Sequence, residues 1–202
     1  MAEHRRKFSR PFGNRPYRKL FVIAVEGDKT EPMYFSLLKN SNSIIQIKCL
    51  KGAGESSPPH VLARMTRHLK KEGLKATDEA WLVVDKDQWT DVQLNQLHDW
   101  SQCDSNRGFA LSNPMFEFWL LLHFEDGNKV NSQRDCVDRL KRHLPEFDKV
   151  FDARKFALNN IAHAITRAKQ RDNPPCTNWP RSMGATTVYR LVEKLLEPEP
   201  HG

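Results

Sequence analysis

The sequence predicts an α/β protein with a mostly parallel, four-stranded sheet flanked by helices and a helical C-terminal half. Two observations predict this class. Short apolar runs alternate with helical segments in the first half of the chain, which is typical of parallel strands joined by right-handed crossovers. In the second half, helical segments follow one another between proline-containing loops without a further strand pattern. At 202 residues, the chain has the length of one domain with a substantial core.

Three of the four predicted strands are short, largely apolar runs, at residues 21–25, 81–84 and 109–112. A run of this kind without alternation is typical of a strand that is buried on both faces of a parallel sheet. Residues 44–50 instead alternate loosely between apolar and polar side chains, so we expect this strand to lie nearer the edge of the sheet.

Apolar residues at helical spacing predict the helices. Thr30 can cap the first of them, and Asn113 can cap the fourth, where Pro114 suits the first helical position. The predicted helices span residues 30–39, 59–71, 90–100, 114–124, 133–144, 154–171 and 185–196.

The basic character of the chain is concentrated at its N-terminus. The net charge is +7, and the first 20 residues hold seven basic side chains against Glu3 alone. We therefore expect residues 1–19 to form a basic, flexible arm, and residues 20–197 to form a single domain of near-neutral charge. The arm can contact the phosphate backbone of nucleic acid, or can act only as a solvated tail.

Several classes are excluded by composition. No apolar run approaches the roughly 20 residues of a membrane span, and the basic start is not followed by the apolar stretch of a signal peptide. We therefore expect a cytoplasmic protein without membrane contact. The four cysteines form no C-x-x-C pair, and the histidines show no ligand spacing, so neither a disulfide framework nor a zinc site is expected.

Acidic residues follow two of the predicted buried strands directly. Glu26 comes after the first strand, and Asp85 and Asp87 come after the third. Ligands of open parallel sheets bind at the carboxyl ends of the strands, so these side chains are candidates for one site. Carboxylates without Cys or His partners suit Mg²⁺, which can polarise a phosphoryl oxygen. Each motif alone is also common in turns and on surfaces.

Glu117 is a further candidate because it lies in the first turn of a helix that is apolar nearly all round. A buried carboxylate requires a partner, such as Arg, Lys or a metal ion. Alternatively, it bonds the free N–H groups at the start of its own helix. His123 lies on another face of this helix, and we interpret it as a packing residue that at most supports substrate binding.

Lys29 and Lys86 are the candidates for phosphate contacts, because one follows Glu26 by three residues and the other lies inside the D-x-D pair. Exposed lysines are common, and ordinary surface residues are the alternative interpretation for both.

Taken together, these motifs resemble the RloB-like family of small toprim-fold proteins from bacterial anti-phage and restriction-linked loci. The resemblance extends from about Leu20 to Leu196. Its most specific part is the stretch from Asn113 to Phe124, N-P-M-F-E-F-W-L-L-L-H-F. The other matching segments are V-E-G-D-K-T-E-P-M-Y-F at residues 25–35, W-L-V-V-D-K-D at 81–87, L-P-E-F-D-K at 144–149 and A-T-T-V-Y-R-L-V-E at 185–193.

The resemblance implies a toprim-like layered domain with Glu26, Asp85 and Asp87 around Mg²⁺ or Mn²⁺. It implies that Glu26 acts in proton transfer and that the D-x-D pair binds metal. The activity it implies is metal-dependent cleavage of nucleic acid, DNA or RNA, in anti-phage defence with an ATPase as partner. A non-catalytic module that binds a nucleotide or nucleic acid and signals to such a partner is the alternative.

A phosphatase of the haloacid dehalogenase type is the third interpretation and the least favoured. In that class the D-x-D follows the first strand, whereas here it follows the third.

Overall fold

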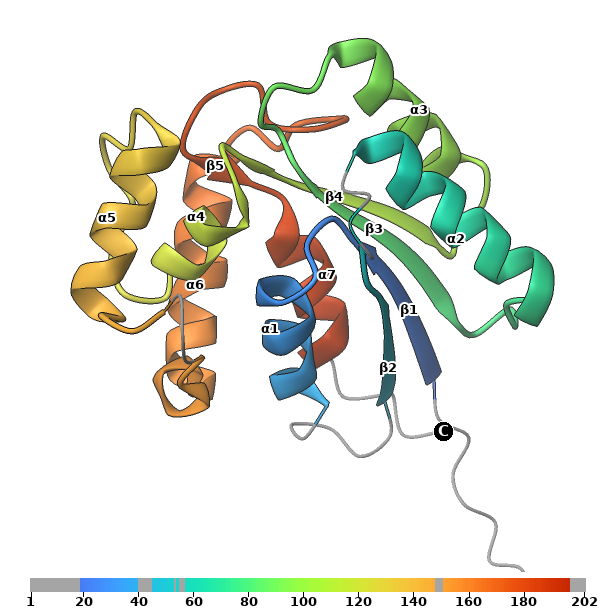
Figure 1. The fold of residues 1–202 in the computed structure, drawn as a ribbon, viewed down its shortest axis with the longest axis horizontal. Helices are drawn as coiled ribbons and strands as arrows, with labels where there is room; N and C mark the ends of the chain where they lie inside the picture. Colours follow the sequence, from blue (N-terminus) through green and yellow to red (C-terminus); the bar gives the residue numbers. More distant parts are fainter. Residues whose placement is uncertain (1–18, 40–44, 53, 55–56, 148–150, 197–202) are drawn as a thin grey trace, which may run out of the picture.

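The computed structural model describes residues 19–39, 45–52, 54, 57–147 and 151–196. It contains a five-stranded sheet in the order β2-β1-β3-β4-β5 (Figure 1). The basic arm predicted at residues 1–19 lies outside the described residues except for Lys19, which begins β1. The strands are β1 (Lys19–Val25), β2 (Ile45–Leu50), β3 (Glu79–Asp85), β4 (Arg107–Asn113) and β5 (Ala185–Thr186).

All four predicted strands are present, and they run parallel to one another. The side chains of β1 explain why its sequence is apolar without alternation. Phe21, Ile23 and Val25 enter one hydrophobic core, whereas Val22 and Ala24 enter a second core on the opposite face of the sheet. The strand is therefore buried on both faces, as the sequence pattern predicts.

Helices cover both faces of the sheet (Figure 1). One face is covered by α2 (Pro58–Glu72) and α3 (Asp91–Gln102), whose apolar residues pack in the second core. The helices whose buried residues form the larger core on the other face are α1 (Thr30–Leu38), α4 (Phe116–Leu121), α5 (Gln133–His143), α6 (Leu158–Arg171) and α7 (Val188–Leu196). No helix in the described part of the chain is long and apolar enough to cross a membrane.

The C-terminal segment differs from its prediction. Residues 185–196 were predicted as one helix, but Ala185 and Thr186 form β5, which pairs antiparallel with β4, and α7 begins only at Val188. Hydrogen bonds from polar side chains explain why the first residues of this segment are extended rather than helical. The Thr186 hydroxyl lies 2.9 Å from the Ser112 hydroxyl, and the Thr187 hydroxyl accepts a hydrogen bond of 3.0 Å from the backbone N–H of Leu111.

Two other helices are shorter than predicted. The segment expected as a helix over residues 114–124 is helical as α4 from Phe116, and Asn113 does not cap it. The Asn113 amide instead donates to the carbonyl of Arg181 at 3.1 Å. The predicted helix 154–171 is divided into a 3₁₀ turn (Ala153–Phe156) and α6. Thr30 is the first residue of α1 rather than its cap.

Candidate active site: an acidic pocket at the carboxyl edge of the sheet

The carboxyl ends of β1 and β3 meet at one edge of the sheet, because the two strands are adjacent and parallel. A pocket of about 380 Å³ opens at this edge. We call it the acidic pocket, and the residues that line it are Glu26, Gly27, Asp28, Lys29, Thr30, Glu31, Asp85, Met115, Phe116 and Glu117. The structure therefore brings together three of the four predicted catalytic residues, Glu26, Asp85 and Glu117.

Glu26 is held by two hydrogen bonds from the segment that follows β3. The backbone N–H of Asp85 donates to one carboxylate oxygen at 3.1 Å, and the indole N–H of Trp89 donates to the other at 3.1 Å. Burial nevertheless raises the pKa of Glu26 from 4.5 to about 7, because it outweighs these two bonds. Near neutral pH this carboxyl can therefore both accept and release a proton.

Asp85 is the carboxylate whose pKa is affected by the charges of three other carboxylates in the pocket. Burial raises the pKa of Asp85 well above its ordinary value, and the charges of Glu31, Glu117 and Glu26 raise it further. A hydrogen bond from the backbone N–H of Phe116 acts in the opposite direction. Four carboxyl groups thus act on one another in the pocket, so a cation bound there would relieve their repulsion.

Glu31 was not predicted as a site residue, yet it is the most buried of these carboxylates at 6 % exposure. Its Oε1 accepts a hydrogen bond of 2.8 Å from the backbone N–H of Gly27, and burial raises its pKa. The sequence feature that could have identified Glu31 is its position in the first turn of α1, a few residues after Glu26 and Gly27. On sequence alone, that place equally suits a surface carboxylate beside a helix start.

Asp87 does not line the acidic pocket. It is exposed, and its carboxylate accepts a hydrogen bond of 2.9 Å from the side-chain amide of Gln133. Its charge still contributes to the raised pKa of Glu26, so it lies near the rim. In this conformation the Asp87 carboxylate is directed toward Gln133, and its role as a metal ligand, which the resemblance implies, stays a prediction.

The three predicted substrate-binding residues have different positions. Lys29 is exposed and lines the acidic pocket. The Lys86 ammonium donates to the backbone carbonyl of Trp89 and so stabilises its own loop. His123 is only 2 % exposed, and its ring nitrogens contact the hydroxyl of Tyr34 at 3.2 Å and the carbonyl of Trp119 at 3.0 Å.

The surroundings of His123 agree with the packing interpretation rather than with substrate contact. Burial lowers its pKa to about 4, so the ring is neutral inside the aromatic core.

The donor atoms of the acidic pocket suit a hard divalent cation. All of its charged donors are carboxylate oxygens, and Mg²⁺ binds through one or two such groups together with water and phosphate oxygens. Among the residues that the structure describes, no three acidic, His or Cys side chains are already arranged to enclose a metal ion. The fit is therefore that of an open site with few protein ligands.

Two residues outside the pocket hold the turn that carries Glu26. Arg64 of α2 donates to the carbonyl oxygens of Val25 at 2.8 Å and Leu50 at 3.1 Å, which ties the ends of β1 and β2 together. Gly52 lies so close to the turn that an added Cβ would be 2.5 Å from the backbone oxygen of Glu26. Arg64 was not singled out from the sequence.

Replacing Gly52 by Ala is expected to displace this turn, because the obstructing atom belongs to the backbone and cannot swing aside. Overpacking of this kind typically costs about 1–3 kcal/mol of unfolding free energy, which urea denaturation would measure. Gly73→Ala is the comparison, since an added Cβ there meets no atom within 4 Å and the cost is only that of its positive φ. An unfolding free energy for Gly52→Ala equal to that of the wild type would contradict the close packing described here.

The fold and the site define an α/β protein with an oxygen-rich acidic pocket at the carboxyl edge of a mostly parallel sheet. The chain belongs to the RloB-like protein family, whose model matches residues 21–195. Comparisons with curated proteins and with solved structures found no match.

Proposed function

We propose that this chain is a metal-dependent nuclease that hydrolyses phosphodiester bonds in nucleic acid. The observation that carries the proposal is the convergence of Glu26, Glu31, Asp85 and Glu117 on one open pocket. Buried carboxylates that repel one another are costly unless a cation neutralises them. A divalent cation in a pocket that opens to solvent is a recurring arrangement for reactions at phosphate.

In the proposed mechanism, Asp85 and Glu117 would hold Mg²⁺ or Mn²⁺ together with water molecules, and Glu31 would add a neighbouring negative charge. The bound ion would supply Lewis-acid polarisation of a phosphoryl oxygen. Glu26 would take the proton from the attacking water, because its pKa of about 7 allows a carboxylate to accept a proton near neutral pH. The ammonium of Lys29, at the rim, would attract the phosphate into the pocket.

We further propose a role in bacterial anti-phage defence with an ATPase as partner. Membership of the RloB-like family supports this role, together with the motifs around Glu26, Asp85 and Glu117. DNA and RNA are both retained as substrates.

Cleavage of plasmid DNA and of total tRNA with Mg²⁺ or Mn²⁺ tests the function directly. We expect metal-dependent cleavage of at least one substrate by the wild type, and a loss of about a thousandfold in Asp85→Asn. Asp99→Asn removes an exposed carboxylate on α3 and is expected to keep full activity. Equal cleavage by wild type and Asp85→Asn would exclude the acidic pocket as the active site.

A non-catalytic binding module is the second candidate. It is favoured by the absence, in the described part of the chain, of three metal-ligating side chains that already enclose an ion. Binding of nucleic acid by a folded wild-type protein that cuts neither substrate with either metal would select this candidate.

A further inference from the structure

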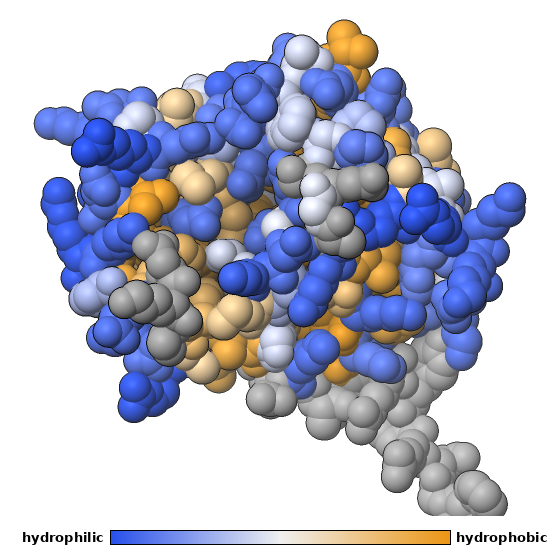
Figure 2. Space-filling view, in the orientation of Figure 1, coloured by the Kyte–Doolittle hydropathy of each residue, from blue (hydrophilic) through white to orange (hydrophobic). Residues whose placement is uncertain are grey.

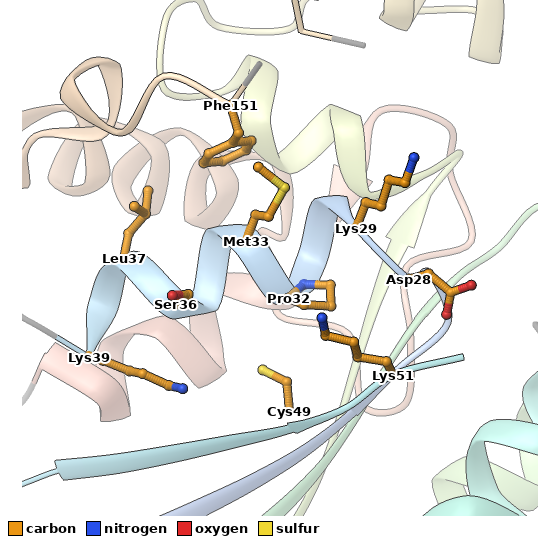
Figure 3. Close-up of a pocket in the computed structure, with 10 residues that line it drawn as sticks. All are labelled: Asp28, Lys29, Pro32, Met33, Ser36, Leu37, Lys39, Cys49, Lys51 and Phe151. Carbon is orange, nitrogen blue, oxygen red and sulfur yellow. The ribbon is translucent and has the colours of Figure 1, made fainter. Parts of the chain in front are cut away.

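A second cavity, of about 520 Å³, lies beside the acidic pocket along the exposed side of α1 (Figure 3). We call it the lysine cavity. Asp28 and Lys29 line both cavities, so the two are neighbours. The residues that line the lysine cavity are Asp28, Lys29, Pro32, Met33, Ser36, Leu37, Lys39, Cys49, Lys51 and Phe151.

The lysine cavity has the opposite charge to its neighbour, since three lysines face a single aspartate. The charges of Lys39 and Lys51 act to lower the pKa of the Cys49 thiol, although burial raises it to about 11, so both ammonium groups lie near the floor of the cavity. Among the described residues, neither these two nor Lys29 forms an ion pair with a carboxylate. Their charges are therefore available to an anionic ligand such as a phosphate.

Apolar side chains also line the lysine cavity. Met33 is 41 % exposed, which is unusual for a large apolar residue in this protein. Phe151 is stacked on Phe156, with 4.7 Å between ring centroids and 5° between ring planes, so one face of its ring is covered. Figure 3 shows the side chains of Met33 and Phe151 next to each other on one side of α1, with Lys39 and Lys51 on the side that faces β2.

The wider surface agrees with this description. Figure 2 shows patches of hydrophobic surface around α1, bordered by hydrophilic side chains. Cations that bind phosphate, next to apolar and aromatic surface, are the combination that binds single-stranded nucleic acid through its backbone and its unstacked bases.

We infer that the lysine cavity holds an unstacked nucleotide adjacent to the scissile phosphate, so that the substrate is single-stranded where it is cut. The inference rests on the nuclease function proposed above. A base inside a duplex is covered on both faces by its neighbours and cannot contact Met33 and Phe151. Lys29, at the boundary between the two cavities, contacts the phosphate on the pocket side, and Lys39 and Lys51 contact the phosphate beyond.

The test is the binding of labelled oligonucleotides to the full-length Asp85→Asn protein, which is not expected to cut them, by fluorescence anisotropy in Mg²⁺ at several salt concentrations. We expect tighter binding of a single strand than of the duplex of the same sequence. The double variant Lys39→Gln/Lys51→Gln is expected to weaken single-strand binding about tenfold and to reduce the salt slope of log K by about 1.4, about 0.7 for each lysine. Lys70→Gln/Lys71→Gln on α2 removes the same charge away from the cavity and is the matched control.

Phe151→Ala and Met33→Ala are expected to weaken single-strand binding about tenfold and to leave duplex binding unchanged, because they remove only the contact with the base. A readout that does not depend on variants is photo-crosslinking of a single strand that carries 5-iodouracil, with the linked peptide identified by mass spectrometry. We expect the crosslink in a peptide that contains Met33 or Phe151.

Three results would overturn the inference. The first is equal weakening by the two double lysine variants, together with crosslinks elsewhere in the chain. The second is competition by a polyglutamate peptide as strong as that by the oligonucleotide, which would assign the cavity to an acidic peptide. If the wild type cuts nucleic acid while either of these results holds, the nucleotide subsite fails and the nuclease function stands. The third is a wild type that neither binds nor cuts nucleic acid, which contradicts the subsite and the nuclease function together.

Discussion

Glu26→Gln is expected to lower metal-dependent cleavage by about a thousandfold, the middle of the range for loss of a proton-transfer group. The Gln side chain has nearly the same volume, but it cannot take a proton. Its carbonyl oxygen can also accept only one of the two hydrogen bonds that Asp85 and Trp89 now donate to the carboxylate. Single-turnover cleavage at saturating substrate would measure the loss in the chemical step, apart from any change in binding.

Trp89→Phe separates the chemistry of Glu26 from its orientation. This variant removes the 3.1 Å indole bond to Glu26 but keeps the carboxylate, so we expect a loss of about tenfold. A loss in Trp89→Phe as large as that in Glu26→Gln would indicate that the position of the carboxylate, rather than its proton, limits the reaction. Full activity in Glu26→Gln would remove Glu26 from the mechanism.

The central sheet could be predicted from sequence because burial on both faces leaves a local signature. The apolar runs that became β1, β3 and β4 need no information from distant residues, since each residue faces one core or the other. The fifth strand has no such signature. Ala185 and Thr186 are extended because they pair with Asn113 and Ser112, more than 70 positions away, and two residues carry no periodicity.

The site residues that could be predicted from sequence are those that directly follow the predicted strands. Glu26 and Asp85 follow buried parallel strands, so their meeting at one edge follows from topology. The direction of Asp87 does not follow from the spacing of a D-x-D. Asp87 has a φ of +33° and its carboxylate lies against Gln133, so the loop conformation turns it away from Asp85.

Glu31 and Trp89 were missed for a related reason, because their importance lies in contacts to the Glu-Gly turn. Glu31 accepts from the backbone of Gly27, and Trp89 reaches Glu26 from 63 positions along the chain. A hydrogen bond between two loops depends on the conformation of both, which the local sequence pattern does not determine.

In metal-free protein, Glu26→Gln is expected to change stability in a pH-dependent way. The folded pKa of Glu26 is raised from 4.5 to about 7, so the folded state binds this proton more tightly than the unfolded state. The stability that this proton contributes is fully present below pH 4.5 and is lost as the pH rises through 7. Above pH 7 the variant avoids this loss, and we expect its Tm in EDTA to exceed that of the wild type by roughly 5 °C.

The comparison of variant with wild type is essential, because other groups titrate in the same range. The pKa of buried His123 is lowered to about 4, so its contribution to stability increases as the pH rises from 4 to 6.5 and opposes that of Glu26. Both proteins contain His123, so the difference between their Tm values cancels its contribution and reports Glu26 together with its effect on the neighbouring Asp85. Differential scanning fluorimetry from pH 4.5 to 8.5 would measure it.

The response of the Tm to Mg²⁺ at pH 8 tests whether the acidic pocket binds a cation. A cation that neutralises the acidic pocket should raise the Tm of the wild type by about 5 °C, and that of Asp85→Asn by much less, because the variant has lost both a ligand and part of the repulsion. Asp99→Asn, on the surface of α3, should respond as the wild type does. An equal Mg²⁺ response in all three proteins would place the ion elsewhere on the chain. In the metal-free experiment, a Tm difference between wild type and Glu26→Gln that does not change with pH would mean that Glu26 is not the group that titrates.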